Sequence, residues 1–128
     1  MPYKPKILIV DDSPELLYVM SFYLEKNSYE VLAVISKELL ESSLKYFHPD
    51  LIILDVFFRN SYTGRELCKN IKDSNEFKKI PILLMSSEYE NLTDLPECMA
   101  DEKIHKPFNL SLLMDKIEQL LDKNKVVL

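Results

Sequence analysis

The chain has 128 residues, a usual length for one domain, and its 47% hydrophobic and 29% charged residues are ordinary for a globular protein. A formal net charge of -5 argues against a nucleic-acid surface, and no apolar run approaches the roughly 20 residues of a membrane span. A single glycine excludes glycine-rich phosphate loops. The start of the chain lacks a signal-peptide core, and Cys68 and Cys98 have no metal-like spacing, so we expect reduced thiols in a cytoplasmic protein. With no linker or repeat, residues 1–128 are expected to form one domain with a core from about 6 to 122.

The first half of the chain alternates predicted strands with predicted helices. Residues 7–10 form a short apolar run and residues 29–35 alternate, and both patterns predict strands. Ser13 and Ser36 are the predicted N-caps of two helices, the first with Pro14 at its opening position. The side chains predicted to face the core are Leu16, Leu17, Met20 and Leu24 in the first helix and Leu39, Leu40, Leu44 and Phe47 in the second.

Three further strands are predicted in the second half. Residues 51–54 are four branched apolar residues that end on Asp55, which is typical of a strand buried on both faces of a sheet. Residues 80–85 and 102–105 are the fourth and fifth predicted strands, with Pro81 near the start of the fourth. Strands that alternate with helices predict an α/β fold with right-handed crossovers and a doubly wound, five-stranded parallel sheet.

Helices are predicted between and after these strands. One begins at Gly64, a weak one spans residues 88–95 before Pro96, and Asn109 caps the last. The residues predicted to face the core are Leu67, Cys68 and Ile71 in the third helix and Leu112, Leu113, Ile117, Leu120 and Leu121 in the last.

Polar residues follow four of the predicted strands. They are Asp11, Asp12, Asp55, Ser86 and Lys106. Each alone has a structural explanation, such as a helix cap, but the carboxyl ends of parallel strands meet at one edge, where α/β sheets bind ligands. Clustered carboxylates repel each other unless a cation lies among them, and Mg²⁺ suits such a set of oxygens. A lysine and a serine hydroxyl suit phosphoryl oxygens, so the edge is predicted to hold an aspartate that accepts a phosphoryl group.

Four segments carry these residues: ILIVDDS from residue 7, PDLIILD ending at residue 55, IPILLMS ending at residue 86, and the Lys106-Pro107-Phe108 triplet. Together they resemble a bacterial two-component response-regulator receiver (CheY-like) domain, from about Lys6 to Asp122. The resemblance implies a flavodoxin-like (βα)5 fold with strand order 2-1-3-4-5. It also implies a signalling domain rather than an enzyme, with at most slow self-dephosphorylation.

The resemblance also implies the role of each site residue. Asp55 would be phosphorylated by a sensor histidine kinase or a phosphotransfer protein. Asp11, Asp12 and Asp55, with the backbone carbonyl of Phe57, would bind Mg²⁺. Ser86 would be the switch hydroxyl and Lys106 the phosphate-binding lysine, held toward the site by a cis bond to Pro107.

Two features depart from the family pattern. A bulky Phe57 follows Asp55 in place of a Met-Pro-Gly-like turn, and Gly64 comes nine residues after Asp55 rather than eight. The bulk of Phe57 is expected to restrict the attacking water and slow self-hydrolysis. Lys103 stands where the family has a switch aromatic, and we expect a solvated charge at a strand edge there. His48 and His105 are expected in a turn and at a strand edge, without a chemical role.

Several functions remain open from the sequence. The chain is expected to be a stand-alone receiver, a relay intermediate or a piece of a longer regulator, with homodimerisation on phosphorylation and no nucleic-acid or membrane partner. An alternative is a phosphorylation-independent pseudo-receiver that serves as an interaction module. An aspartate-nucleophile phosphatase is disfavoured because Phe57 stands where a second acid is needed. A flavodoxin-like cofactor binder is disfavoured because no Ser/Thr/Gly-rich loop follows the first strand.

Overall fold

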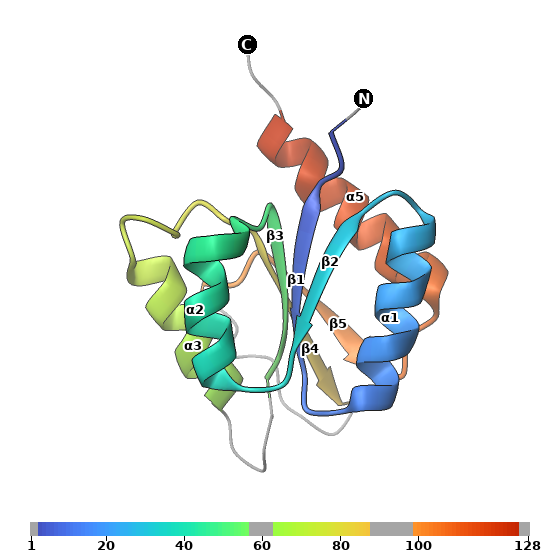
Figure 1. Cartoon of the computed structure of the whole chain (residues 1–128), viewed down its shortest axis with the longest axis horizontal. Helices are drawn as coiled ribbons and strands as arrows, with labels where there is room; N and C mark the ends of the chain where they lie inside the picture. The colour runs from blue at the N-terminus through green and yellow to red at the C-terminus, as the bar shows by residue number, and fades with distance from the viewer. Residues whose placement is uncertain (1–2, 57–62, 88–98, 126–128) are drawn as a thin grey trace.

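Strands and helices alternate along the parts of the chain that the computed structural model describes, residues 3–56, 63–87 and 99–125 (Figure 1). The strands form one parallel sheet in the order β2-β1-β3-β4-β5, which confirms the predicted doubly wound α/β fold. The predicted helix over residues 88–95 lies outside the described residues. The elements are β1 (Lys6–Val10), α1 (Pro14–Lys26), β2 (Glu30–Val34), α2 (Lys37–Phe47), β3 (Leu51–Asp55), α3 (Thr63–Asp73), β4 (Ile82–Ser87), β5 (Glu102–Lys106) and α5 (Leu110–Lys125).

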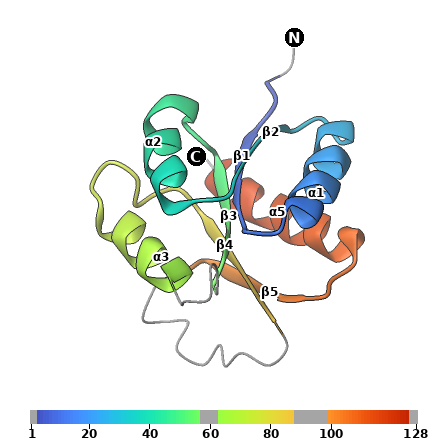
Figure 2. The same ribbon diagram turned by 60° about the horizontal axis from the view of Figure 1, so that its bottom comes forward.

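Helices cover both faces of the sheet, α1 and α5 on one side and α2 and α3 on the other (Figures 1 and 2). Successive strand residues point to opposite faces, so Ile7 and Ile9 pack in the α1–α5 layer while Leu8 and Val10 pack in the α2–α3 layer. Every residue of β3 is buried, which confirms the reading of residues 51–54 as a strand covered on both faces.

The two serines predicted as N-caps cap the first turns of α1 and α2. The hydroxyl oxygen of Ser13 accepts a hydrogen bond from Leu16 N–H, and that of Ser36 accepts one from Leu39 N–H. His48 ends α2 with a positive φ of 53° and is exposed, as predicted. None of the helices in the described ranges is long and apolar enough to cross a membrane.

Three predictions about packing and boundaries are wrong. Leu39 and Leu112 are exposed, although both were expected to face the core. Adjacent helical residues point about 100° apart, and the rotation of these two helices turns Leu40 and Leu113 toward the core and leaves Leu39 and Leu112 partly in solvent. The fourth strand begins at Ile82 rather than residue 80, because the N–H of Ile80 is bonded to the Phe77 carbonyl in the preceding turn.

Candidate functional site

Three carboxylates meet where β1 and β3 end. One oxygen from each of Asp11, Asp12 and Asp55 lies within 4.8 Å of the other two. Asp11 and Asp55 are buried, while Asp12 is exposed to solvent. The strand order explains the meeting, because β1 and β3 are neighbours and Val10 pairs with Leu54.

Lys106, at the end of the outer strand β5, reaches this cluster across β4. Its Nζ donates to Asp11 Oδ2 at 2.7 Å and to Asp55 Oδ2 at 3.3 Å. The other oxygen of Asp11 accepts from the backbone N–H of Ser13 at 2.9 Å. Burial acts to lower the pKa of the Lys106 ammonium, but the hydrogen bond to Asp11 and the charge of Asp55 outweigh it, and the pKa is raised above its ordinary value. The ammonium therefore stays charged and balances part of the acidic cluster.

Ser86 lies on β4, the strand between β3, which ends on Asp55, and β5, which ends on Lys106. Its neighbour Met85 pairs with Asp55 on β3, and Ser86 itself pairs with His105 on β5. The residue is fully buried, and its Oγ has no hydrogen-bond partner among the described residues. A buried hydroxyl without a partner costs about 1–3 kcal/mol, so an oxygen-bearing ligand at this edge would be favoured to bond to it.

The remaining predicted residues lie around this edge. The Lys106–Pro107 peptide bond is cis. Lys103 and His105 are exposed on β5, the outer strand of the sheet, so Lys103 is the solvated edge charge that the sequence predicts. Phe57, the predicted carbonyl ligand, lies outside the described residues.

Sequence reasoning noted Gly64 as the start of a helix and as displaced from the family's glycine position, but missed why a glycine is needed there. The N–H of Gly64 donates to the Val56 carbonyl at 3.1 Å. A Cβ on this residue would overlap the carbonyl oxygen of Asp55 and come within 2.8 Å of the Val56 Cα. Only glycine therefore allows α3 to begin against the backbone at the end of β3. The available signal was that Gly64 is the chain's single glycine, placed nine residues after Asp55.

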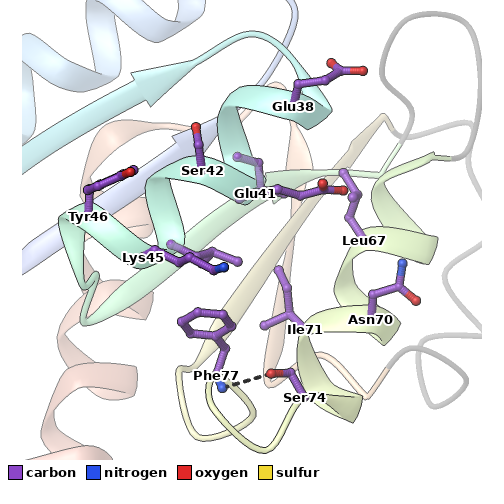
Figure 3. Close-up of a pocket in the computed structure, with 12 residues that line it drawn as sticks. Glu38, Glu41, Ser42, Lys45, Tyr46, Leu67, Asn70, Ile71, Ser74 and Phe77 are labelled. Atoms are coloured by element: carbon purple, nitrogen blue, oxygen red, sulfur yellow. Dashed lines mark hydrogen bonds between the residues drawn. The ribbon is translucent and has the colours of Figure 1, made fainter.

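The arrangement has a defined chemical capacity. The acidic triad is capable of holding a metal ion. Its ligand atoms are all oxygens, which hard cations such as Mg²⁺ prefer. The buried Asp55 carboxylate lies beside the Lys106 ammonium, and the buried hydroxyl of Ser86 comes from the neighbouring strand β4. A separate cavity of about 640 Å³ lies between α2 and α3, lined by residues such as Leu67 and Phe77, and none of its lining residues belongs to this edge (Figure 3).

A parallel α/β sheet of order 2-1-3-4-5 with an acidic triad at its carboxyl edge defines a class of phospho-acceptor domain. The family model "Response regulator receiver domain" matches residues 7–118, and the chain belongs to that family. It is a receiver domain of a two-component system, a phospho-acceptor regulatory domain rather than a catalytic enzyme. The acidic cluster of Asp11, Asp12 and Asp55 is consistent with the phosphorylation site.

Curated relatives and solved structures agree with this assignment. The phosphate regulon transcriptional regulatory protein PhoB of Rhizobium meliloti is 30% identical over 124 residues, 94% of this chain and 54% of that protein. The nisin biosynthesis regulatory protein NisR of Lactococcus lactis is 35% identical over 115 residues, 88% of this chain and 48% of that protein. This chain thus spans about half the length of these relatives.

Two solved structures show the same fold at comparable length. The signal receiver domain of a histidine kinase from Syntrophus aciditrophicus has a TM-score of 0.87 at 29% identity, covering 97% of this chain and 95% of that one. Chemotaxis response regulator CheY4 of Vibrio cholerae has a TM-score of 0.82 at 25% identity, covering 92% and 99%.

Proposed function

We propose that the domain accepts a phosphoryl group on Asp55 from a histidine kinase or a phosphotransfer protein, and that this changes its contacts with a target protein. The observation that carries the proposal is the buried Asp55 carboxylate, held within 4.8 Å of two further acids and bonded to Lys106. A carboxylate oxygen of Asp55 attacks the phosphorus of phosphohistidine. The new O–P bond forms as the P–N bond breaks, and the imidazole leaves with the electron pair.

The proposed roles follow from the chemistry of each group. Asp11, Asp12 and Asp55 hold Mg²⁺, which when bound neutralises charge on the acids and on the incoming phosphoryl oxygens. Lys106 binds a phosphoryl oxygen as a point charge, and the Ser86 hydroxyl, which has no partner within the described ranges, donates to another. The backbone carbonyl of residue 57 is proposed as a further metal ligand on the family resemblance alone.

The wider context of this function is also a proposal. Residues 1–128 are proposed to act as one receiver domain with a core from about 6 to 122, either alone, as a relay intermediate or within a longer regulator. Phosphorylation is proposed to promote homodimerisation. We place the reaction in the cytoplasm, where ATP is available to a histidine kinase.

Incubation with acetyl phosphate, followed by intact mass measurement, tests the phospho-acceptor role. The wild type is expected to gain one phosphoryl group with Mg²⁺ and none with EDTA. Asp55→Asn is expected to gain none under either condition. Asp73→Asn, which removes an exposed acid paired with Lys69, serves as the matched control and is expected to behave as the wild type. No gain under any condition would contradict the proposal and favour a phosphorylation-independent interaction module.

A further inference from the structure

The two outer strands of the sheet differ in how they are protected from pairing with another chain. β5 carries two lysines and an exposed histidine, which discourage edge-to-edge pairing. β2 has the sequence EVLAV, so after Glu30 it offers four apolar residues and no lysine, arginine or proline. β1 pairs with one side of β2, and no other strand in the described parts of the chain pairs with its other side.

The backbone of β2 shows which groups face outward. Glu30 N–H donates to the Pro5 carbonyl, and the Val34 carbonyl accepts from Asp11 N–H, so both residues direct their backbone groups at the β1 side. Alternate residues of a strand direct these groups to the same side, so Leu32 does likewise. Val31 and Ala33 therefore direct their N–H and C=O groups away from the sheet.

Exposed apolar side chains flank this edge. Ile35, directly after the strand, is 42% exposed, and on α2 Leu39 is 48% and Tyr46 85% exposed. Leu39 and Tyr46 are seven residues apart and so lie on one side of the helix. In the close-up, Tyr46, which also lines the rim of the α2–α3 cavity, lies at the side of α2 farthest from Leu67 of α3, and α2 lies between α3 and β2 in the ribbon views (Figures 1 and 3). The unpaired edge and this apolar flank thus form one surface, the β2 edge surface, made of Val31, Ala33, Ile35, Leu39 and Tyr46.

We propose that the β2 edge surface binds a second copy of this chain, with the two β2 strands antiparallel about a two-fold axis. The axis passes beside Leu32, which faces Leu32 of the second copy. Val31 then lies opposite Ala33 of the second copy, and each such pair exchanges both N–H···O=C bonds because these groups point outward. The interface is isologous, and it joins the two parallel sheets into one.

Charge and apolar contacts favour this occupant and this orientation. The antiparallel arrangement brings exposed Glu30 at the start of one strand toward the first turn of α2 in the other copy, where exposed Lys37 precedes exposed Glu38 and the helix N-terminus favours an acid. A parallel arrangement would place Glu30 beside Glu30, a like-charge pair that destabilises a sheet. The α2 helices of the two copies lie on the same face of the joined sheet, so Leu39 and Tyr46 meet their counterparts there.

Sedimentation velocity across a concentration series tests the proposal. The wild type is expected to convert from monomer to dimer between about 1 µM and about 1 mM, the range of weak to moderate interfaces. Ala33→Pro deletes an outward N–H that β1 does not use, and it is expected to weaken dimerisation at least about 100-fold. Ala33→Ser keeps this N–H and is expected to match the wild type.

A second pair of variants keeps the test decisive if Ala33→Pro does not fold by circular dichroism. Leu39→Glu adds a charge to the β2 edge surface and is expected to give a monomer at all concentrations. Val19→Glu makes the same change at a similarly exposed site on α1 and is expected to leave the dimer intact. Asp55→Asn is expected to dimerise like the wild type, which separates this contact from phosphorylation. A wild type that stays monomeric throughout, or a dimer unaffected by Leu39→Glu, would overturn the proposal.

Discussion

Replacing Lys106 with methionine tests the electrostatic balance of the acidic cluster. The substitution keeps the aliphatic stem but removes an ammonium that lies 2.7 Å from Asp11 and 3.3 Å from Asp55. Removing one partner of a buried ion pair typically costs about 3–5 kcal/mol, because the other charge stays buried without compensation. The Lys106 side chain is 26% exposed, so we expect the lower end, a loss of about 3 kcal/mol in the free energy of unfolding without Mg²⁺.

A bound divalent cation should reverse part of this loss. The Lys106 ammonium and a cation at the triad would both interact with Asp11 and Asp55, and their like charges would repel each other. Removing the ammonium is therefore expected to raise the affinity for Mg²⁺ by about tenfold, or about 1.4 kcal/mol. Saturating Mg²⁺ should then reduce the deficit of Lys106→Met to about half its value in EDTA.

Urea unfolding of wild type and variant, each with EDTA and with saturating Mg²⁺, measures both quantities. Lys103→Met is the matched control, because it removes an exposed lysine from the same strand, and it is expected to stay within about 0.5 kcal/mol of the wild type. An equal loss for Lys106→Met with and without Mg²⁺ would refute the reasoning that lysine and metal serve the same carboxylates.

Three further predictions concern single sites. Gly64→Ala is expected to lower the free energy of unfolding by about 1–3 kcal/mol, measured in urea, because the new methyl group meets the Asp55 backbone; an unchanged stability would contradict the close approach. The hydrogen bond from Tyr3 to Asp50 raises the pKa of Tyr3 from 10.0 to about 12, so its stabilising contribution is present below pH 10 and lost as the pH rises through about 12. Ultraviolet titration of wild type against Tyr3→Phe should isolate this late-ionising group, and a midpoint near 10 would count against it. Phe57→Asn is expected to shorten the lifetime of the proposed phosphorylated Asp55, measured by loss of the phosphoryl group in mass spectra, because a smaller polar side chain would restrict the attacking water less. An unchanged lifetime would contradict the expectation that the bulk of Phe57 slows hydrolysis.

The sheet and the meeting of its polar strand ends could be predicted because each depends on a local signal. Short branched runs such as residues 51–54 predict buried strands, and alternation with helices makes those strands parallel. Once the strands are parallel, Asp11 and Asp55 must reach the same edge, whatever lies between them in the chain. The sequence pattern therefore predicts the topology, and the topology brings the three acids together.

Other features depend on packing that no local pattern contains. The rotation of α2 decides whether Leu39 or Leu40 faces the sheet, and contacts with the sheet set that rotation. Gly64 is needed only because α3 begins against the Asp55 backbone, which is visible once both elements are placed. The exposure of the β2 edge likewise follows from strand order, since the apolar sequence of β2 would suit a central strand equally well.

The charge balance of the site links the fold to its function. Lys106 is 95 residues from Asp11 and 51 from Asp55 along the chain, so the lysine reaches the acids only after β5 has joined the sheet. Two buried carboxylates without this ammonium would repel each other and would lack compensation for their burial. The outermost strand thus supplies a positive charge that balances part of the acidic cluster at the centre of the sheet. It follows that changes which loosen β5 should also alter the phosphoryl transfer proposed for Asp55, even when they lie far from the acids.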